Sequence, residues 1–158
     1  MVEPGVTNLA VSNAVAHAGF YYAPDPSSQI ACTIGGNVAE NSGGVHCLKY
    51  GVTTNNVLGV ELVTIDGEVL RIGGKHLDAD AYDLLGVIVG SEGLLGVVTE
   101  VTVRILRKPD TARAVLLGFP SVEQGGACVA AIISAGIIPG GMEMMDKPAI
   151  LAAEAFVH

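Results

Sequence analysis

Residues 33–44, TIGGNVAENSGG, contain two Gly-Gly pairs eight positions apart with two asparagines between them. Glycine lets another group approach the backbone closely and can adopt a positive φ. Successive N–H groups of such a segment can point at one anion, and Asn37 and Asn41 add side-chain donors and acceptors. The spacing matches neither GxGxxG nor GxxxxGK[ST]. The segment therefore predicts a glycine-rich loop, either one that binds a ligand or one that forms a tightly packed turn.

Two other segments are also rich in turn residues. Residues 24–28, PDPSS, form a rigid loop whose carboxylate and hydroxyls can cap a helix or hold a ligand. Residues 90–96, GSEGLLG, place Glu92 between glycines. There the glutamate either accepts a hydrogen bond from a ligand or belongs to a loop that leads into the following strand.

Hydrophobic periodicity and turn residues indicate a chain of mixed helices and strands. Asp66-Gly67 between two apolar runs predicts a hairpin. Val101, Val103 and Ile105 alternate with polar residues, as in a half-buried strand that ends before Pro109. We expect helices over residues 7–18, 80–88 and 121–135 and from Pro148 onward, and strands over 57–64, 68–72, from 97 onward, 114–119 and 137–145.

Composition excludes several classes of protein. Half of the 158 residues are hydrophobic and 21 are glycine, which is typical of a globular chain with many tight turns. The formal net charge is −8, and only residues 104–108 approach a basic cluster, so a nucleic-acid-binding face is not expected. The three cysteines, Cys32, Cys47 and Cys128, form no CxxC or His/Cys cluster, which favours neither a disulfide framework nor a metal site.

One uncharged stretch, residues 124–142, is long enough to raise the question of a membrane segment. Its glycines, Ser134 and Pro139 favour a buried helix followed by a strand instead. The start of the sequence resembles the end of a strand, and its end falls inside a predicted helix. We therefore expect a fragment of a longer chain, with a small complete domain that has frayed ends as the alternative.

In their order and spacing, these segments resemble a known family. Residues 24–51, PDPSSQIACTIGGNVAENSGGVHCLKYG, and 90–103, GSEGLLGVVTEVTV, resemble the FAD-binding domain of flavoproteins related to vanillyl-alcohol oxidase. Within that group, residues 45–51 and the later IIPGGMEMMD, residues 137–146, are similar to FAD subunits of the glycolate oxidase type. D-lactate and D-2-hydroxyglutarate dehydrogenases are close relatives of these subunits.

The resemblance implies an α+β fold in two parts. Residues 1–109 would be the second subdomain of a PCMH-type FAD-binding domain, and residues 110–158 would begin an α/β cap domain, the C-terminal domain of FAD-linked oxidases. The implied cofactor is noncovalent FAD, although His46 and Cys47 are residue types to which some relatives attach flavin. No catalytic residue and no metal ligand of the family has a match in this chain.

The resemblance also implies which residues contact FAD. They come from the proline loop, the glycine-rich loop with the residues after it, and the segment around Glu92. The implied contacts are Pro24, Asp25, Ser27, Gly35, Gly36, Asn37, Gly43, Gly44, Tyr50, Gly51, Glu92, Gly93, Gly96 and Val97.

The implied function is oxidation of a 2-hydroxy acid to a 2-keto acid, with hydride transfer to flavin in the intact enzyme. Two alternatives stay open: a truncated, inactive FAD-binding module, and another member of the superfamily such as an ether-lipid synthase. The resemblance further implies partner flavin and iron–sulfur subunits and a cytoplasmic location at the inner face of the membrane. Apolar surface left uncovered in a fragment predicts self-association.

Overall fold

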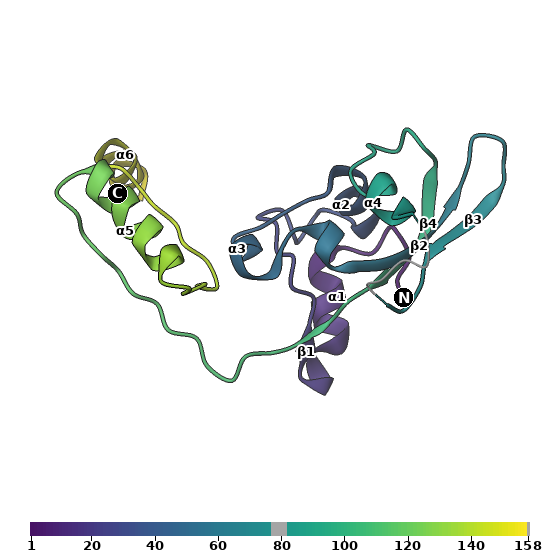
Figure 1. The fold of residues 1–158 in the computed structure, drawn as a ribbon, viewed down its shortest axis with the longest axis horizontal. Coiled ribbons are helices and arrows are strands. Elements are labelled where there is room, and N and C mark those ends of the chain that lie inside the picture. Colours follow the sequence, from purple (N-terminus) through teal and green to yellow (C-terminus); the bar gives the residue numbers. More distant parts are fainter. Residues whose placement is uncertain (77–81, 158) are drawn as a thin grey trace.

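The computed structural model describes residues 1–76 and 82–157. Figure 1 shows two groups of elements joined by an extended segment. The first group holds every strand and the helices up to α4, and the second holds α5 and α6. The structure is thus a mixture of helices and strands, as the sequence predicts.

A three-stranded antiparallel sheet forms the centre of the first group. Its strands are β2 (Val57–Val63), β3 (Val69–Gly73) and β4 (Val97–Val103), in the order β3-β2-β4. The β2–β3 hairpin turns at Asp66-Gly67, where Gly67 has φ 81°, so the predicted hairpin is confirmed. Val2 forms an isolated antiparallel bridge with Val101, next to the β4 edge.

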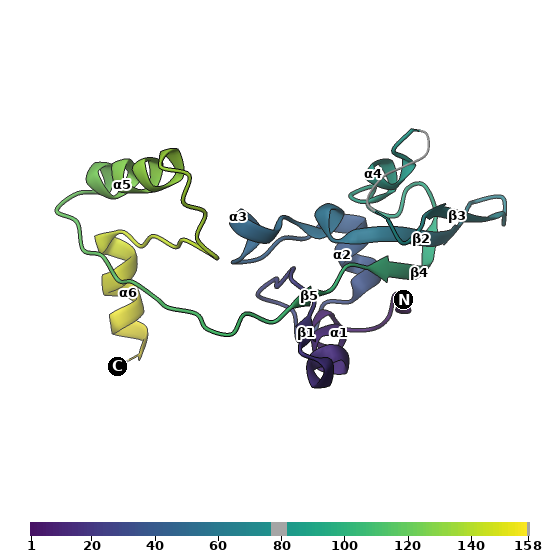
Figure 2. The same ribbon diagram turned by 60° about the horizontal axis from the view of Figure 1, so that its bottom comes forward.

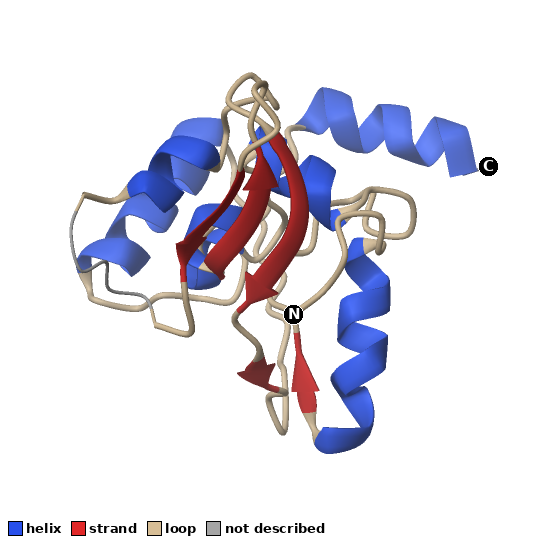
Figure 3. Ribbon diagram, turned by 90° about the vertical axis from the view of Figure 1, so that its right-hand side faces the viewer, coloured by secondary structure: helices blue, strands red, loops and turns tan. Residues whose placement is uncertain are grey.

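Two helices cover one face of this sheet, as Figure 3 shows. They are α2 (Ile34–Glu40) and α4 (Leu84–Ile88), and both contact the strands. Ile34 and Val38 of α2 are fully buried, together with Val101 of β4. The i, i+4 spacing of Ile34 and Val38 places both side chains on the helix face that meets the sheet.

The opposite face of the sheet carries polar side chains. Arg71 Nε donates a 2.9 Å hydrogen bond to Glu61 Oε2, and Thr99 Oγ1 donates one of 2.9 Å to Glu61 Oε1. The hydrogen bond from Arg71, followed by that from Thr99, lowers the pKa of Glu61 below its ordinary value. This face therefore meets solvent, which accounts for the polar alternation in the strand sequences.

The chain start forms a helix that packs on a small two-stranded ribbon. Helix α1 (Asn8–Val15) continues as a 3₁₀ turn, Ala16–Ala18, and stops at Gly19 with φ 77°, as predicted. A two-stranded antiparallel ribbon follows, with β1 (Phe20–Tyr21) paired to β5 (Leu106–Arg107). Asn8 is buried, and its Nδ2 donates a 3.0 Å hydrogen bond to the Pro24 carbonyl, which ties α1 to the proline loop.

The second group contains two helices and little core. Helix α5 (Val122–Ser134) begins at the predicted N-cap Ser121, whose Oγ accepts the Gln124 N–H at 3.3 Å. Gly136, with φ 76°, follows its end. Helix α6 (Lys147–Val157) starts after Asp146, whose Oδ1 accepts the Ala149 N–H at 2.8 Å.

Three predictions about secondary structure are wrong. The glycine-rich segment is largely helical, and the strands predicted over residues 114–119 and 137–145 are not formed. A strand needs a partner for its N–H and C=O groups, and the described residues provide none to these two segments. Of the helix predicted over 80–88, residues 84–88 are helical, while residues 80 and 81 lie outside the described part of the chain.

Candidate functional site

The glycine-rich segment forms a helix because its first residues are capped and its apolar residues are buried. Thr33 is the N-cap, and its Oγ1 accepts the Gly36 N–H at 3.2 Å. The Gly35 N–H donates to the Pro4 carbonyl at 2.9 Å. A Cβ at Gly35 would lie 2.7 Å from the Pro4 Cβ, so this position requires glycine for close packing. The chain leaves the helix at Asn41, which has φ 51°.

A pocket of about 300 Å³ lies where the start of α2 meets the loop before β4. This volume is at the lower end of the range for small-molecule sites, roughly 300–1,000 Å³. The pocket brings together two distant segments of the sequence, residues 35–39 and residues 88–98. Its lining residues are Gly35, Gly36, Val38, Ala39, Ile88, Ser91, Gly93, Gly96, Val97 and Val98.

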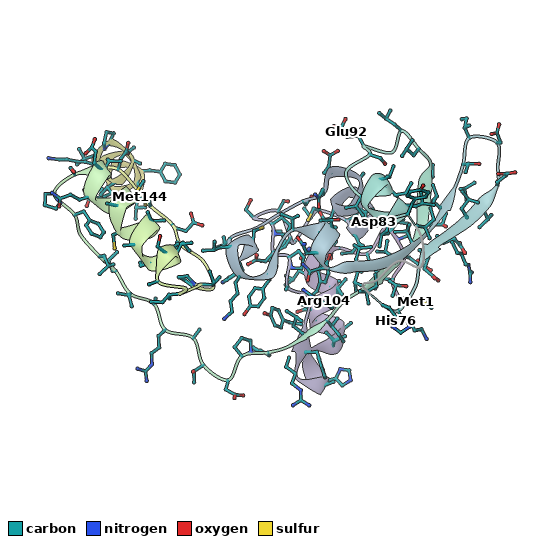
Figure 4. All side chains as sticks on the ribbon, in the orientation of Figure 1. Met1, His76, Asp83, Glu92, Arg104 and Met144 are labelled. Carbon is teal, nitrogen blue, oxygen red and sulfur yellow. The ribbon has the colours of Figure 1, made fainter. Side chains whose placement is uncertain are left out.

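Two backbone hydrogen bonds attach the second segment to α2. The Gly90 N–H donates to the Val38 carbonyl at 2.8 Å, and the Glu92 N–H donates to the Ala39 carbonyl at 2.9 Å. Glu92 adopts φ 55°, a conformation uncommon for a residue with a side chain. Its carboxylate is exposed, and Figure 4 shows it at the outer edge of the loop. The carboxylate therefore lies beside the pocket, which it does not line.

The proline loop and the residues before α3 (Cys47–Tyr50) form a second cluster of predicted site residues. Asp25 Oδ2 lies 2.5 Å from His46 Nδ1, and Asp25 Oδ1 accepts the His46 N–H at 3.3 Å. A Cβ at Gly44 would overlap the Asp25 backbone carbonyl, so the two loops approach closely only because residue 44 is glycine.

The end of α3 adds aromatic side chains to this cluster. The Tyr50 and Tyr21 rings meet edge to face, with centroids 6.2 Å apart. Burial, followed by the hydrogen bond with the Tyr50 side chain, raises the pKa of Tyr21 well above its usual range. The Tyr21 phenol is therefore neutral at physiological pH and can act as a hydrogen-bond donor. Gly51 then reverses the chain with φ 76°.

The structure brings some predicted site residues together and leaves others apart. The pocket contains Gly35, Gly36, Gly93, Gly96 and Val97, and the second cluster contains Pro24, Asp25, Gly43, Gly44, Tyr50 and Gly51.

Ser27 and Asn37 lie outside the pocket lining. Ser27 is exposed. Asn37 is buried, and its Nδ2 has no hydrogen-bond partner among the described residues. A buried donor without a partner costs free energy, so this amide is suited to a group that the protein itself does not provide.

The backbone N–H groups at the start of α2 are already used within the protein. Gly35 donates to Pro4, Gly36 to the Thr33 hydroxyl, and Asn37 to the Thr33 carbonyl at 2.9 Å. A ligand in the pocket would therefore contact the bare Cα surfaces of the glycines. Glycine Cα atoms and the side chains of Val38, Ile88 and Val98 make a mostly apolar wall that suits a flat ring system.

These residues fit part of a flavin dinucleotide. A pocket of about 300 Å³ accommodates one ring system with its neighbouring groups, not the whole cofactor. At its edge, the exposed Glu92 carboxylate supplies one acceptor.

Sequence reasoning missed four apolar residues of the pocket and one polar residue, and it also missed a partner of Asp25. The apolar residues are Val38, Ala39, Ile88 and Val98. Their signal was the helical spacing of apolar residues, which the glycines obscured in α2. Ser91 also lines the pocket, and His46 pairs with Asp25 without any sequence signal to connect them.

Two further properties hold for the described residues. Within 1–76 and 82–157, no three His, Cys, Asp or Glu side chains gather closely enough to hold a metal ion. The helices of the same part of the chain are all too short or too polar to cross a bilayer.

Comparison with known families assigns both parts of the chain. Residues 1–73 match the FAD binding domain, and residues 108–158 match the C-terminal domain of FAD linked oxidases.

Curated relatives match along nearly the whole chain. The glycolate oxidase subunit GlcD of Escherichia coli K12 is 62% identical over 157 residues, which are 99% of this chain and 32% of that protein. GlcD of Bacillus subtilis is 45% identical, covering 98% of this chain and 33% of the relative. A D-lactate dehydrogenase of Archaeoglobus fulgidus is 36% identical, and the match covers 95% of this chain and 34% of that relative. The chain thus spans about a third of the length of these relatives.

Solved structures agree on the fold. Two crystal forms of alkyldihydroxyacetonephosphate synthase superpose with TM-scores of 0.71 and 0.70 at 23% identity. The match covers 88% of this chain and 25% and 27% of those chains. These superpositions show the fold alone. The sequence matches over residues 1–73 and 108–158, which together make up most of the chain, assign it to the FAD-linked oxidases, with one segment from their FAD binding domain and one from their C-terminal domain.

Proposed function

We propose that this chain is part of an FAD-dependent oxidoreductase that converts a 2-hydroxy acid to a 2-keto acid. The observation that carries the proposal is the pocket in which Gly35 and Gly36 meet Gly93, Gly96 and Val97. These segments come from distant parts of the sequence, and the same residues carry the family resemblance. Relatives named glycolate oxidase subunit and D-lactate dehydrogenase favour a small 2-hydroxy acid as the substrate.

FAD, when bound, supplies the hydride acceptor of such a reaction. The chain's own residues would bind and orient it. Glycine Cα atoms and Val98 would hold one ring system between α2 and the β4 loop, while Glu92 would accept a hydrogen bond at the pocket edge. The cluster of Asp25, Gly44 and Tyr50 would form a second contact surface, built on the other end of the glycine-rich segment.

We propose residues 1–109 as the FAD-binding part and residues 110–158 as part of the cap domain. The word subunit in the relative's name favours assembly with further subunits, for which flavin and iron–sulfur proteins are our candidates. We also propose a cytoplasmic location for the assembly, at the inner face of the membrane.

An inactive FAD-binding module is the second candidate function. The partial size of the pocket favours it for this chain alone, because binding energy from the rest of the dinucleotide would be lacking. An ether-lipid synthase is a weaker candidate, since the 23% identity to such a synthase speaks for the fold alone.

The experiment is an FAD titration of the purified chain, followed by flavin fluorescence. Ala39→Leu fills the pocket from α2, and Ala131→Leu changes an exposed position of α5 as the matched control. We expect weak, saturable binding that Ala39→Leu lowers at least about tenfold, a loss of about 1.4 kcal/mol, and that Ala131→Leu leaves unchanged. Equal affinity of both variants would place the cofactor elsewhere, and the absence of saturable binding would refute the proposal for this chain.

Flavin absorbance separates the two candidate functions once binding is established. A loaded chain that is reduced by glycolate or D-lactate acts as an oxidoreductase. A loaded chain that both acids leave oxidised is a binding module.

A further inference from the structure

Asp25 was predicted to contact FAD, but the structure uses both of its carboxylate oxygens within the protein. Oδ1 accepts the His46 N–H at 3.3 Å, and Oδ2 lies 2.5 Å from His46 Nδ1. The two residues are 21 positions apart, so this pair joins the proline loop to the residues before α3. A carboxylate that accepts a hydrogen bond from Nδ1–H fixes the tautomer and the ring orientation of the histidine.

The segment that carries His46 is also held from its other side. The Gly44 N–H lies 2.7 Å from Cys47 Sγ, and Gly44 itself presses against the Asp25 backbone. The Tyr50 ring, 6.5 Å from the His46 ring between centroids, lies next to it on α3. The position of His46 is therefore determined by Asp25 together with its immediate neighbours.

The outer side of this segment meets the C-terminal part of the chain. Figures 1 and 2 both place the turn before α6 beside α3. A Cβ at Gly141 would lie 2.9 Å from the Val45 carbonyl oxygen, and one at Gly140 would lie 3.5 Å from His46 Cδ2. The turn thus rests on Val45 and on the edge of the His46 ring.

We propose that Asp25 and His46 are a positioning pair that sets how the turn of residues 139–142 docks on the FAD-binding part. The contact joins the two segments that match different family domains, residues 1–73 and 108–158. It is a docking surface whose partner is the chain's own C-terminal part. The inference goes beyond the proposed function, because it requires no bound flavin, and it can fail while FAD binding is confirmed.

Neighbouring glycines provide the first test. Gly141→Ala inserts a methyl group against a backbone oxygen, whereas Gly140→Ala makes an ordinary van der Waals contact. Neither glycine has a positive φ, so the two substitutions differ in available space alone. In small-angle X-ray scattering of the whole chain, we expect Gly141→Ala to increase the maximum dimension and Gly140→Ala to leave it unchanged. Identical scattering by the two variants would overturn the proposed docking contact.

Asp25 provides the second test, by NMR. Asp25→Ala removes both acceptors, and we expect loss of the NOE between the His46 ring and Gly140, with a changed tautomer in the ring ¹⁵N shifts. Asp25→Asn keeps an acceptor for the His46 N–H and can pair with Nδ1, so the NOE should persist. Circular dichroism checks that both variants fold. A folded Asp25→Ala variant that retains the NOE would overturn the role of the pair, and an unfolded one leaves the decision to the glycine variants.

Discussion

The two parts of this chain use similar apolar residues with different results. In the first part, Ile34, Leu62 and Val101 are at most 1% exposed, because helices cover one face of a sheet. In the second part, no residue of α6 is buried, and Leu116 is 99% exposed. Apolar side chains become a core only when a second layer covers them. The comparison therefore predicts where substitutions matter.

The largest effect is expected in the core of the first part. Ile34→Ala leaves a cavity beneath α2, and we expect it to lower the free energy of unfolding by about 2–5 kcal/mol. Leu151→Ala in α6 changes a side chain that is 54% exposed and should stay within about 0.5 kcal/mol. Urea denaturation of both variants measures the difference. Equal losses of unfolding free energy in the two variants would contradict the comparison, since they would reveal a core around α6.

Substitutions of glycines inside helices test the comparison between the two parts further. Gly126→Ala in α5 meets nothing within 4 Å and should raise stability by about 0.5–1 kcal/mol. Gly36→Ala in α2 should gain less, because its Cβ would lie 3.3 Å from the Thr33 Oγ1 that caps the helix. Thermal unfolding ranks the two variants, and a larger gain for Gly36→Ala would contradict the crowded capping geometry.

Uncovered apolar surface in the second part should cause association without adding stability. Val115 and Leu116 are 79% and 99% exposed. Replacing both with lysine should shift sedimentation at high concentration toward the monomer and change stability by less than about 0.5 kcal/mol. Association that persists in this variant would assign the contact to another surface.

The smallest effects concern two glutamates, one in each part. The pKa of Glu61 is lowered by Arg71 and Thr99, and that of Glu123 by its own backbone N–H and then by Ser121. Because both folded-state pKa values lie below the ordinary 4.5, each group stabilises the fold above that pH and loses this contribution on acidification. Arg71→Met should raise the pKa of Glu61 alone, and Ser121→Ala that of Glu123 alone. Carboxyl ¹³C titrations test this, and a shared response would show that the two parts are coupled.

Local signals predicted the elements that depend on local interactions. The Asp66-Gly67 turn between two apolar runs predicted the hairpin, and Ser121 and Gly136 marked the ends of α5. The glycine-rich helix was missed because two adjacent glycines disfavour a helix, while the burial of Ile34 and Val38 that outweighs this is a tertiary effect. For the two absent strands, the local pattern favours a strand, but the described residues offer no neighbouring strand to pair with.

The site was predicted to a similar extent. The resemblance selected Gly35, Gly36, Gly93, Gly96 and Val97, which now line one pocket. It also selected Asp25, whose carboxylate the structure pairs with His46. Composition and spacing could not reveal that pairing, because it depends on the folded path of two loops.

The segment between Arg107 and Pro120 links the two parts of the chain without a core of its own. Every residue there is exposed, and no helix or strand forms beyond Arg107 until α5 begins. Extra residues placed in this stretch would displace no buried side chain and break no ladder. Its length can therefore vary among homologous sequences, or be altered by design, so that a reporter protein inserted near Arg113 should leave the sheet and its helices intact.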